Sequence, residues 1–120
     1  MRLLIATAGA GLLLTLSAAA SPTTGGFHGT VLKGPIRPVC SAGEPCDAPA
    51  AVTLLFSRSG RTTATRSRAD GRYRVLLPAG IYTVTTKERI GIDRNIRPHR
   101  VKARAGHVDR LDFFIDTGIR

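Results

Sequence analysis

Arginine is the residue whose number and spacing in this chain are best suited to chemistry. The chain carries 18 Lys and Arg against 8 Asp and Glu, for a net charge of +10, and 15 of the 18 basic residues are Arg. Four of them lie close together, at Arg66, Arg68, Arg72 and Arg74. A guanidinium group holds a phosphate or carboxylate through two parallel hydrogen bonds, and a cluster of such groups attracts polyanions. These four residues are therefore the predicted anion-binding surface.

The same arginines also have an interpretation that needs no ligand. Cations on the exposed face of a strand discourage pairing between sheet edges, and a coding bias toward arginine would give a similar composition. The sequence leaves both interpretations open. For a protein outside the cytoplasm we do not expect nucleic acid as the polyanion. An anionic cell-wall polymer, a lipid headgroup, a polysaccharide or an envelope protein is the partner to test.

No set of residues in the chain has the spacing of a known catalytic site. The three histidines, His28, His99 and His107, lack the His-Glu-x-x-His or His-x-x-Glu spacing of a zinc peptidase. No serine lies in a Gly-x-Ser-x-Gly segment, and a serine nucleophile would also need a base that is held by an acid. We therefore expect no enzymatic activity, no metal and no cofactor.

The first twenty residues have the pattern of a cleaved secretory signal. Arg2 precedes an uncharged, mostly apolar stretch from Leu3 to Leu16, and the small residues Ser17–Ala20 follow. The alternative is a retained membrane anchor, but a spanning helix needs about 20 consecutive apolar residues. Glycine, threonine and serine interrupt this stretch. We expect a signal-peptide helix over residues 1–20 that is cleaved after Ala20, with a secreted or envelope location for the rest and no later membrane span.

Cys40 and Cys46 are the two cysteines of the chain, and they lie in a proline-rich segment. A zinc site would need further ligands, and no histidine is near them in the sequence. An exported chain enters an oxidising compartment, where two cysteines at this spacing are expected to form a disulfide. Closing so short a loop stabilises the fold by on the order of 2 kcal/mol, through restriction of the unfolded chain.

Short alternating runs separated by Gly, Pro and Asp predict an all-β domain over residues 27–120, preceded by a flexible tether over residues 21–26. Asp70-Gly71 is the strongest turn sequence and predicts a hairpin that places the four arginines on neighbouring strands. The predicted strands lie at residues 27–32, 52–56, 62–68, 72–77, 81–87, 101–105 and 111–115. Their inward positions predict a core of Val52, Leu54, Phe56, Tyr73, Val75, Tyr82, Val84, Leu111 and Phe113.

Several of these segments resemble the carboxypeptidase regulatory-like domain, a transthyretin-like (prealbumin-like) module. They are Gly29–Val31, the Asp-Gly-Arg-Tyr-Arg-Val segment at 70–75, and the Leu-Pro-Ala-Gly-Ile-Tyr-Thr-Val segment at 77–84. The cysteine loop and residues 114–120 are similar to those of small secreted bacterial members. The likeness spans residues 26–120 and implies a single seven-stranded antiparallel β-sandwich, prealbumin-like or Ig-like. It implies no activity, since this module has no chemistry of its own in metallocarboxypeptidases.

The sequence therefore leads us to expect an exported, non-catalytic module that is a structural or binding protein of the cell envelope or extracellular space. The alternative is an accessory subunit, or an unrecognised hydrolase of the transthyretin-like superfamily.

The cleavage site gives a first testable prediction. We expect the mature protein to begin at Ser21, because small residues occupy the positions that signal peptidase inspects. N-terminal sequencing of the protein recovered from the envelope or the culture medium checks this. Recovery with Met1 intact would contradict it.

Overall fold

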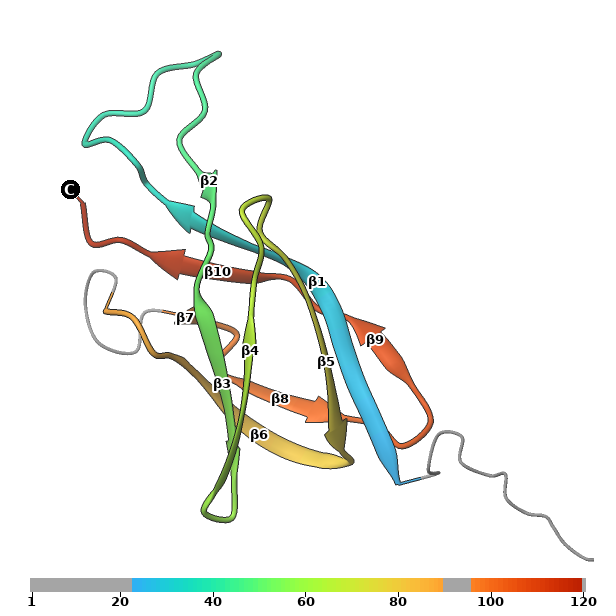
Figure 1. The fold of residues 1–120 in the computed structure, drawn as a ribbon. Coiled ribbons are helices and arrows are strands. Elements are labelled where there is room, and N and C mark those ends of the chain that lie inside the picture. Colours follow the sequence, from blue (N-terminus) through green and yellow to red (C-terminus); the bar gives the residue numbers. More distant parts are fainter. Residues whose placement is uncertain (1–22, 90–95, 120) are drawn as a thin grey trace, which may run out of the picture.

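The computed structural model describes residues 23–89 and 96–119, which are built of strands and turns (Figure 1). Within these residues no helix is present that could cross a bilayer. The predicted signal segment, residues 1–20, lies outside the described residues. The strand segments are β1 (Thr24–Gly34), β2 (Ala48–Pro49), β3 (Thr53–Arg58), β4 (Arg61–Arg66), β5 (Arg72–Pro78), β6 (Gly80–Thr86), β7 (Ile96–Arg97), β8 (Arg100–Ala103), β9 (Val108–Arg110) and β10 (Phe113–Asp116).

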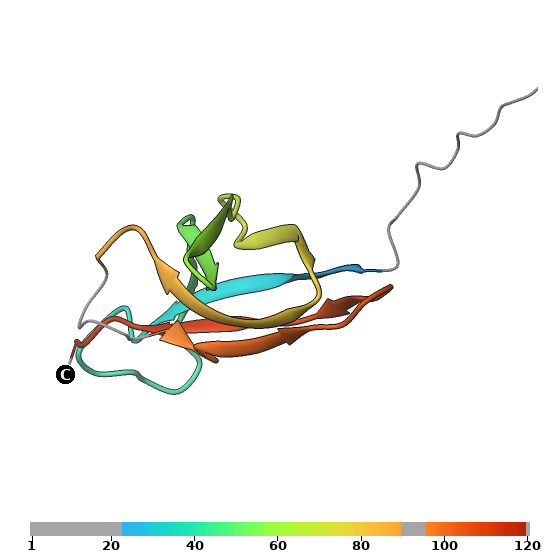
Figure 2. The same cartoon turned by 90° about the horizontal axis from the view of Figure 1, so that it is seen from below.

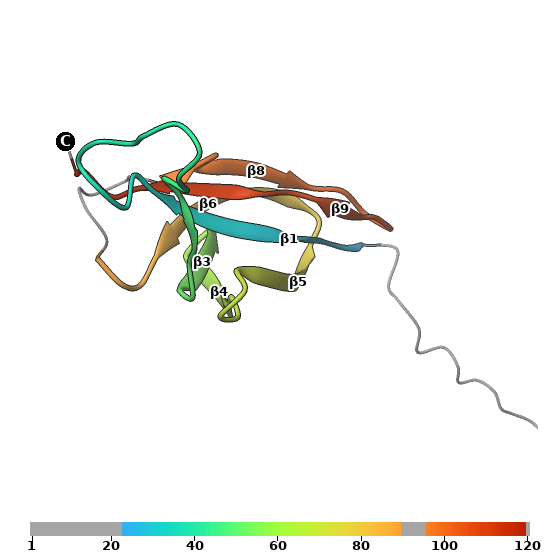
Figure 3. The ribbon, with the colours of Figure 1, turned by 90° about the horizontal axis from the view of Figure 1, so that it is seen from above.

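Strand β1 is the centre of a six-stranded sheet and changes partners along its length. Its first half pairs with β5 on one edge and β9 on the other, and its second half pairs with β2 and β10. β7 extends the sheet beyond β10. A second sheet has the order β4-β3-β6-β8. Figures 2 and 3 view the fold from below and from above, with the long strand β1 near the middle of the molecule.

The core lies between the two sheets and consists of the inward residues of both. Each residue of the predicted core is buried, except that Leu111 is partly buried and packs against the others. Phe56 contacts Phe27 and Phe113 at ring-centroid distances of 6.2 and 6.1 Å. Ile96 was not predicted to be inward, yet it is only 1% exposed, because β7 brings it against the core.

The disulfide between Cys40 and Cys46 is confirmed, with a Cα–Cα distance of 5.5 Å. This distance lies within the range that a disulfide requires. The bond closes the loop between β1 and β2, which projects beyond the end of the sandwich (Figure 1). The backbone N–H of Ile36 donates to the carbonyl of Cys46 at 2.8 Å, and Arg37 lies 3.2 Å from Glu44.

Three details of the predicted fold are wrong. Thr24–Gly26 belong to β1 and not to a tether, because they pair with Leu76–Pro78 at the far end of β5. The sandwich is not purely antiparallel, because β9 and β10 both pair with β1 in parallel. The turn after β8 reverses the chain, so that β9 runs in the same direction as β1. The described residues form ten strand segments in place of the predicted seven, because β2, β7 and β9 are short additions and the predicted strand over residues 111–115 corresponds to β10.

Tyr82 gives a test of the core. Its ring is 4% exposed and its hydroxyl donates to the carbonyl of Pro78 at 2.6 Å, so Tyr82→Ala should lower the free energy of unfolding by about 3 to 5 kcal/mol. The neighbouring Ile81 is 49% exposed, so Ile81→Ala should change it by less than about 1 kcal/mol. Urea denaturation of both variants measures the difference. Equal losses would contradict the register of β6.

Candidate anion-binding groove

Arginines from three separate segments surround a groove on the outer face of the six-stranded sheet. The groove has a volume of about 470 Å³, and β1, β5, β9 and the connection between β4 and β5 contribute to it. The side chains that give it polar and charged character are His28, Thr30, Arg68, Arg72, Arg74 and Arg110.

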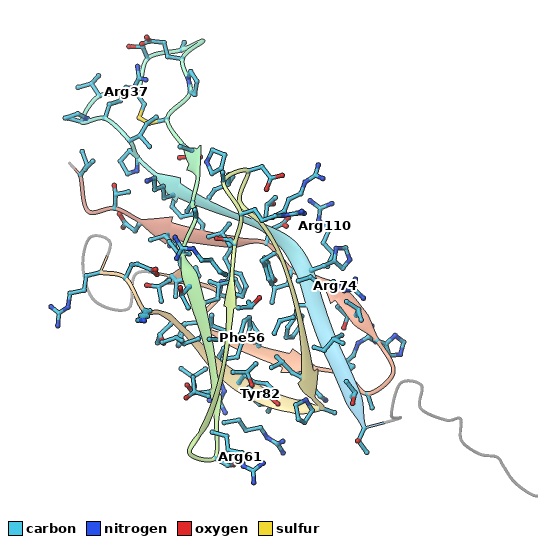
Figure 4. The ribbon with its side chains drawn as sticks, in the orientation of Figure 1. Arg37, Phe56, Arg61, Arg74, Tyr82 and Arg110 are labelled. Carbon is cyan, nitrogen blue, oxygen red and sulfur yellow. A yellow bond between two sulfur atoms is a disulfide. The ribbon has the colours of Figure 1, made fainter. Side chains whose placement is uncertain are left out.

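The register of the strands explains why these side chains meet. His28 lies opposite Arg74 on β5 and opposite Arg110 on β9. Directly opposed residues in a sheet point to the same side, so the three form a row across three strands. Arg72 lies opposite Thr30 and begins the next row. Figure 4 shows Arg74 and Arg110 on the same side of the molecule, away from Arg61.

Arg68 reaches the groove through the connection between the two sheets. Its backbone N–H donates to the carbonyl of Arg72 at 2.9 Å, and its own carbonyl accepts from the N–H of Gly71 at 2.8 Å. Gly71 has a φ of +84° and lies against β1, where a Cβ atom would be 2.6 Å from the carbonyl oxygen of Val31. Glycine is therefore required at this position, and the tight turn brings Arg68 beside Arg72.

Arg66 does not line the groove, so the structure separates it from the other three arginines of the predicted anion-binding surface. Asp70-Gly71 turns the chain from one sheet to the other and does not form a hairpin, so β4 and β5 lie in different sheets. The guanidinium of Arg66 instead donates to Glu88 at 2.9 Å and to the hydroxyl of Thr53 at 3.2 Å. These contacts fix the beginning of β3.

The sequence interpretation missed His28 and Arg110 as members of this site. Alternation places both on outward positions, since Phe27 and Leu111 face inward. Nothing in the local pattern indicates that β9 pairs with β1 in parallel, and that pairing is what brings Arg110 to the groove.

The groove has more cations than carboxylates. Arg72 lies 3.6 Å from Asp70 and Arg110 lies 3.3 Å from Asp112, and both pairs are exposed. Such pairs are weak in water. Within residues 23–89 and 96–119, no carboxylate forms an ion pair with Arg68 or Arg74. Four guanidinium groups thus share two carboxylates, and the surplus positive charge favours an anion.

Asp112 fixes the strands beneath these cations. β9 ends at Arg110 and β10 begins at Phe113, and in the gap the Asp112 carboxylate accepts from the backbone N–H of Thr30 at 2.9 Å and from its hydroxyl at 3.1 Å. The backbone hydrogen bond from Thr30 lowers the pKa of Asp112. Partial burial opposes that shift, and the Thr30 hydroxyl and Arg110 add to it.

Tyr73 lies under the groove and also supports it. Its hydroxyl donates to the carbonyl of Leu111 at 2.6 Å, which ties β5 to the segment between β9 and β10. Burial raises the pKa of Tyr73 well above its ordinary value, and the charge of Asp112 raises it further. The hydroxyl therefore remains a hydrogen-bond donor.

The chemistry that this arrangement offers is hydrogen-bond donation to an anion. Guanidinium groups stay protonated and cannot exchange a proton with a substrate. Among the described residues, no hydrogen bond joins a histidine to a carboxylate, and no three His, Cys, Asp or Glu side chains gather as a metal site.

The role of Asp112 is testable. We expect Asp112→Ala to lower the free energy of unfolding near neutral pH by about 1 to 2 kcal/mol, because the N–H of Thr30 loses its acceptor. The folded pKa is lowered, so this contribution is present above the ordinary value of 3.8 and is lost as pH falls through the folded pKa. Urea denaturation at neutral and at acidic pH measures the free energy of unfolding. The difference in this free energy between wild type and variant should be smaller in acid. A difference that does not change with pH would contradict this role.

No protein-family model matches the chain, and no curated protein matches its sequence. The structure is similar to part of the Bacillus anthracis TIE protein, with a TM-score of 0.55 and 15% identity over 78% of this chain and 16% of that chain. A DUF3823 family protein from Parabacteroides merdae gives a TM-score of 0.44 and 20% identity over 77% of this chain and 45% of that chain. This chain thus spans a minor part of each. The likeness to the TIE protein shows the fold alone.

Proposed function

We propose that the protein is a non-catalytic binding module that acts outside the cytoplasm and holds anionic polymers of the cell envelope in its arginine groove. One observation carries the proposal. Arg68, Arg72, Arg74 and Arg110 come from three segments of the chain to one groove, where two carboxylates of the described residues accompany them.

The spacing of these cations suits a polymer better than a single small ion. Alternate residues along a strand lie about 6.6 Å apart, and neighbouring strands lie about 4.8 Å apart. Arg72 and Arg74 therefore follow one another along β5, while Arg74 and Arg110 flank His28 across the sheet. A chain with a negative charge on each repeat unit can contact several guanidinium groups at once, and each contact releases a counterion.

The location outside the cytoplasm is supported by the disulfide and by the predicted signal segment. Disulfides persist in oxidising compartments and are rare in the cytosol. The Cys40–Cys46 bond lies in an exposed loop, where a reducing environment would reach it.

For the fold, we propose the carboxypeptidase regulatory-like (prealbumin-like) sandwich. Each of the seven predicted strands overlaps one of the longer segments, which are β1, β3, β4, β5, β6, β8 and β10. In this module the groove occupies an outer sheet face, which is free to bind without any change to the core.

The arginine groove gives a binding test with a matched control. The groove variant is Arg68→Gln/Arg72→Gln/Arg74→Gln, and the control variant is Lys87→Gln/Arg89→Gln/Arg97→Gln, which removes the same charge from exposed positions elsewhere. Anisotropy titrations of labelled long-chain polyphosphate should show a loss of at least about tenfold for the groove variant at low salt. The slope of log K against log salt should fall by about 2, because three phosphate contacts are removed.

The control variant should lose much less affinity than the groove variant, because long-range attraction alone is screened within about 10 Å. Equal losses in the two variants would show that binding follows net charge, and would contradict a specific groove.

A further inference from the structure

A second pocket with unpaired arginines lies on the outer face of the other sheet. It has a volume of about 650 Å³ and lies beside the hairpin that joins β3 to β4. The residues that matter for its chemistry are Ser57, Arg58, Gly80, Thr83 and Arg100.

The register of the four-stranded sheet aligns hydroxyl groups with a guanidinium in this pocket. Ser57 lies opposite Thr62 on β4 and opposite Thr83 on β6, and Thr83 lies opposite Arg100 on β8. Within the pocket the row therefore runs through Ser57 and Thr83 and ends on Arg100, while Thr62 lies beside the pocket with its hydroxyl 3.0 Å from that of Ser57. Hydroxyl and guanidinium groups are the donors that commonly hold phosphate oxygens.

Arg58 completes the pocket because Gly80 leaves room for it. A Cβ atom at position 80 would lie 2.5 Å from the Cζ atom of Arg58, and Gly80 has a φ of +151°, which side chains rarely adopt. The glycine thus lets the Arg58 guanidinium lie across the beginning of β6. In the described part of the chain, neither Arg58 nor Arg100 has a carboxylate within ion-pair distance.

The two cationic sites face in opposite directions. The arginine groove is on the outer face of the six-stranded sheet, and this second pocket is on the outer face of the four-stranded sheet. The buried core separates the sheets, which pack about 10 Å apart in sandwiches. Figure 4 shows Arg61, at the tip of the β3–β4 hairpin, far from Arg74 and Arg110.

We infer that the module is bivalent, with each cationic site holding a separate phosphate-bearing polymer, so that one protein molecule bridges two polymer chains. The inference rests on the proposed function for the first site. It goes beyond that function because a single groove would retain the protein on a polymer without joining two of them. Because the two sites lie on opposite faces of one rigid sandwich, each can hold a different polymer chain and the protein then joins the two chains.

A bridging experiment tests the inference with polyphosphate as the probe. Polyphosphate is fixed to beads, the protein is bound and washed, and fluorescent polyphosphate is then added. We expect wild type to recruit the fluorescent polymer. The variant Arg58→Gln/Arg100→Gln should remain on the beads through the arginine groove, yet recruit at least about tenfold less. A Lys87→Gln/Arg89→Gln variant, with the same change in charge, should recruit as wild type does.

The outcomes separate this inference from the proposed function. Recruitment by Arg58→Gln/Arg100→Gln at the wild-type level would overturn bivalency, whether it arose from self-association or from the groove alone. Wild type that stays on the beads but recruits nothing, as when one polymer wraps around both faces, would also overturn bivalency and leave the proposed function intact. Wild type that fails to bind the beads would overturn both.

Discussion

Strand β1 is hydrogen-bonded along both of its edges, and its two halves have different partners. This double pairing is possible only where neighbouring backbones approach closely. At Gly29 a Cβ atom would lie 2.7 Å from the carboxylate of Asp112 and would also overlap the carbonyl of Leu111. A larger residue would push away the segment between β9 and β10 and remove the partner of the Thr30 N–H. The parallel pairing of the last strands, β9 and β10, with the first strand, β1, depends on this close contact.

The charged surfaces are a consequence of the same pairing. The side chains at every second position of β1, β5 and β10 form the core. The side chains at the alternate positions therefore face solvent. On β5 these positions are Arg72 and Arg74, and parallel pairing adds Arg110 from a strand more than thirty residues later. The strands fix the backbone positions of Arg72, Arg74 and Arg110, and only Arg68 comes from a connection between strands.

The parts of the fold that alternate locally could be predicted from the sequence. Tyr73, Val75 and Leu77 are buried while Arg72 and Arg74 are exposed, because a strand sends successive side chains to opposite faces whatever its neighbours are. The disulfide could also be predicted, since its loop is short.

Contacts between distant segments could not be predicted in this way. The alternation in residues 61–78 is the same whether Asp70-Gly71 closes a hairpin or carries the chain to another sheet. Because the chain passes to the other sheet at this turn, Arg66 forms an ion pair with Glu88 and does not line the groove. Arg110 and the buried Ile96 depend on the pairing of β9 with β1 and of β7 with β10, and no local pattern encodes either partner. Three of the four arginines that line the groove were therefore in the predicted cluster, but the way in which distant segments assemble the groove could not be predicted.

The surplus positive charge of the two arginine-lined surfaces affects the stability of the module. Arginines that share too few carboxylates repel one another, and this repulsion weakens the compact state. A carboxylate near Arg68, Arg74, Arg58 or Arg100 would reduce this repulsion. An anion that binds the folded state alone adds stability in proportion to the logarithm of its concentration over its dissociation constant. Within residues 23–89 and 96–119, the arginines that lack a carboxylate partner thus lower the stability of the free protein, and under the proposed function a bound polyanion would offset this repulsion.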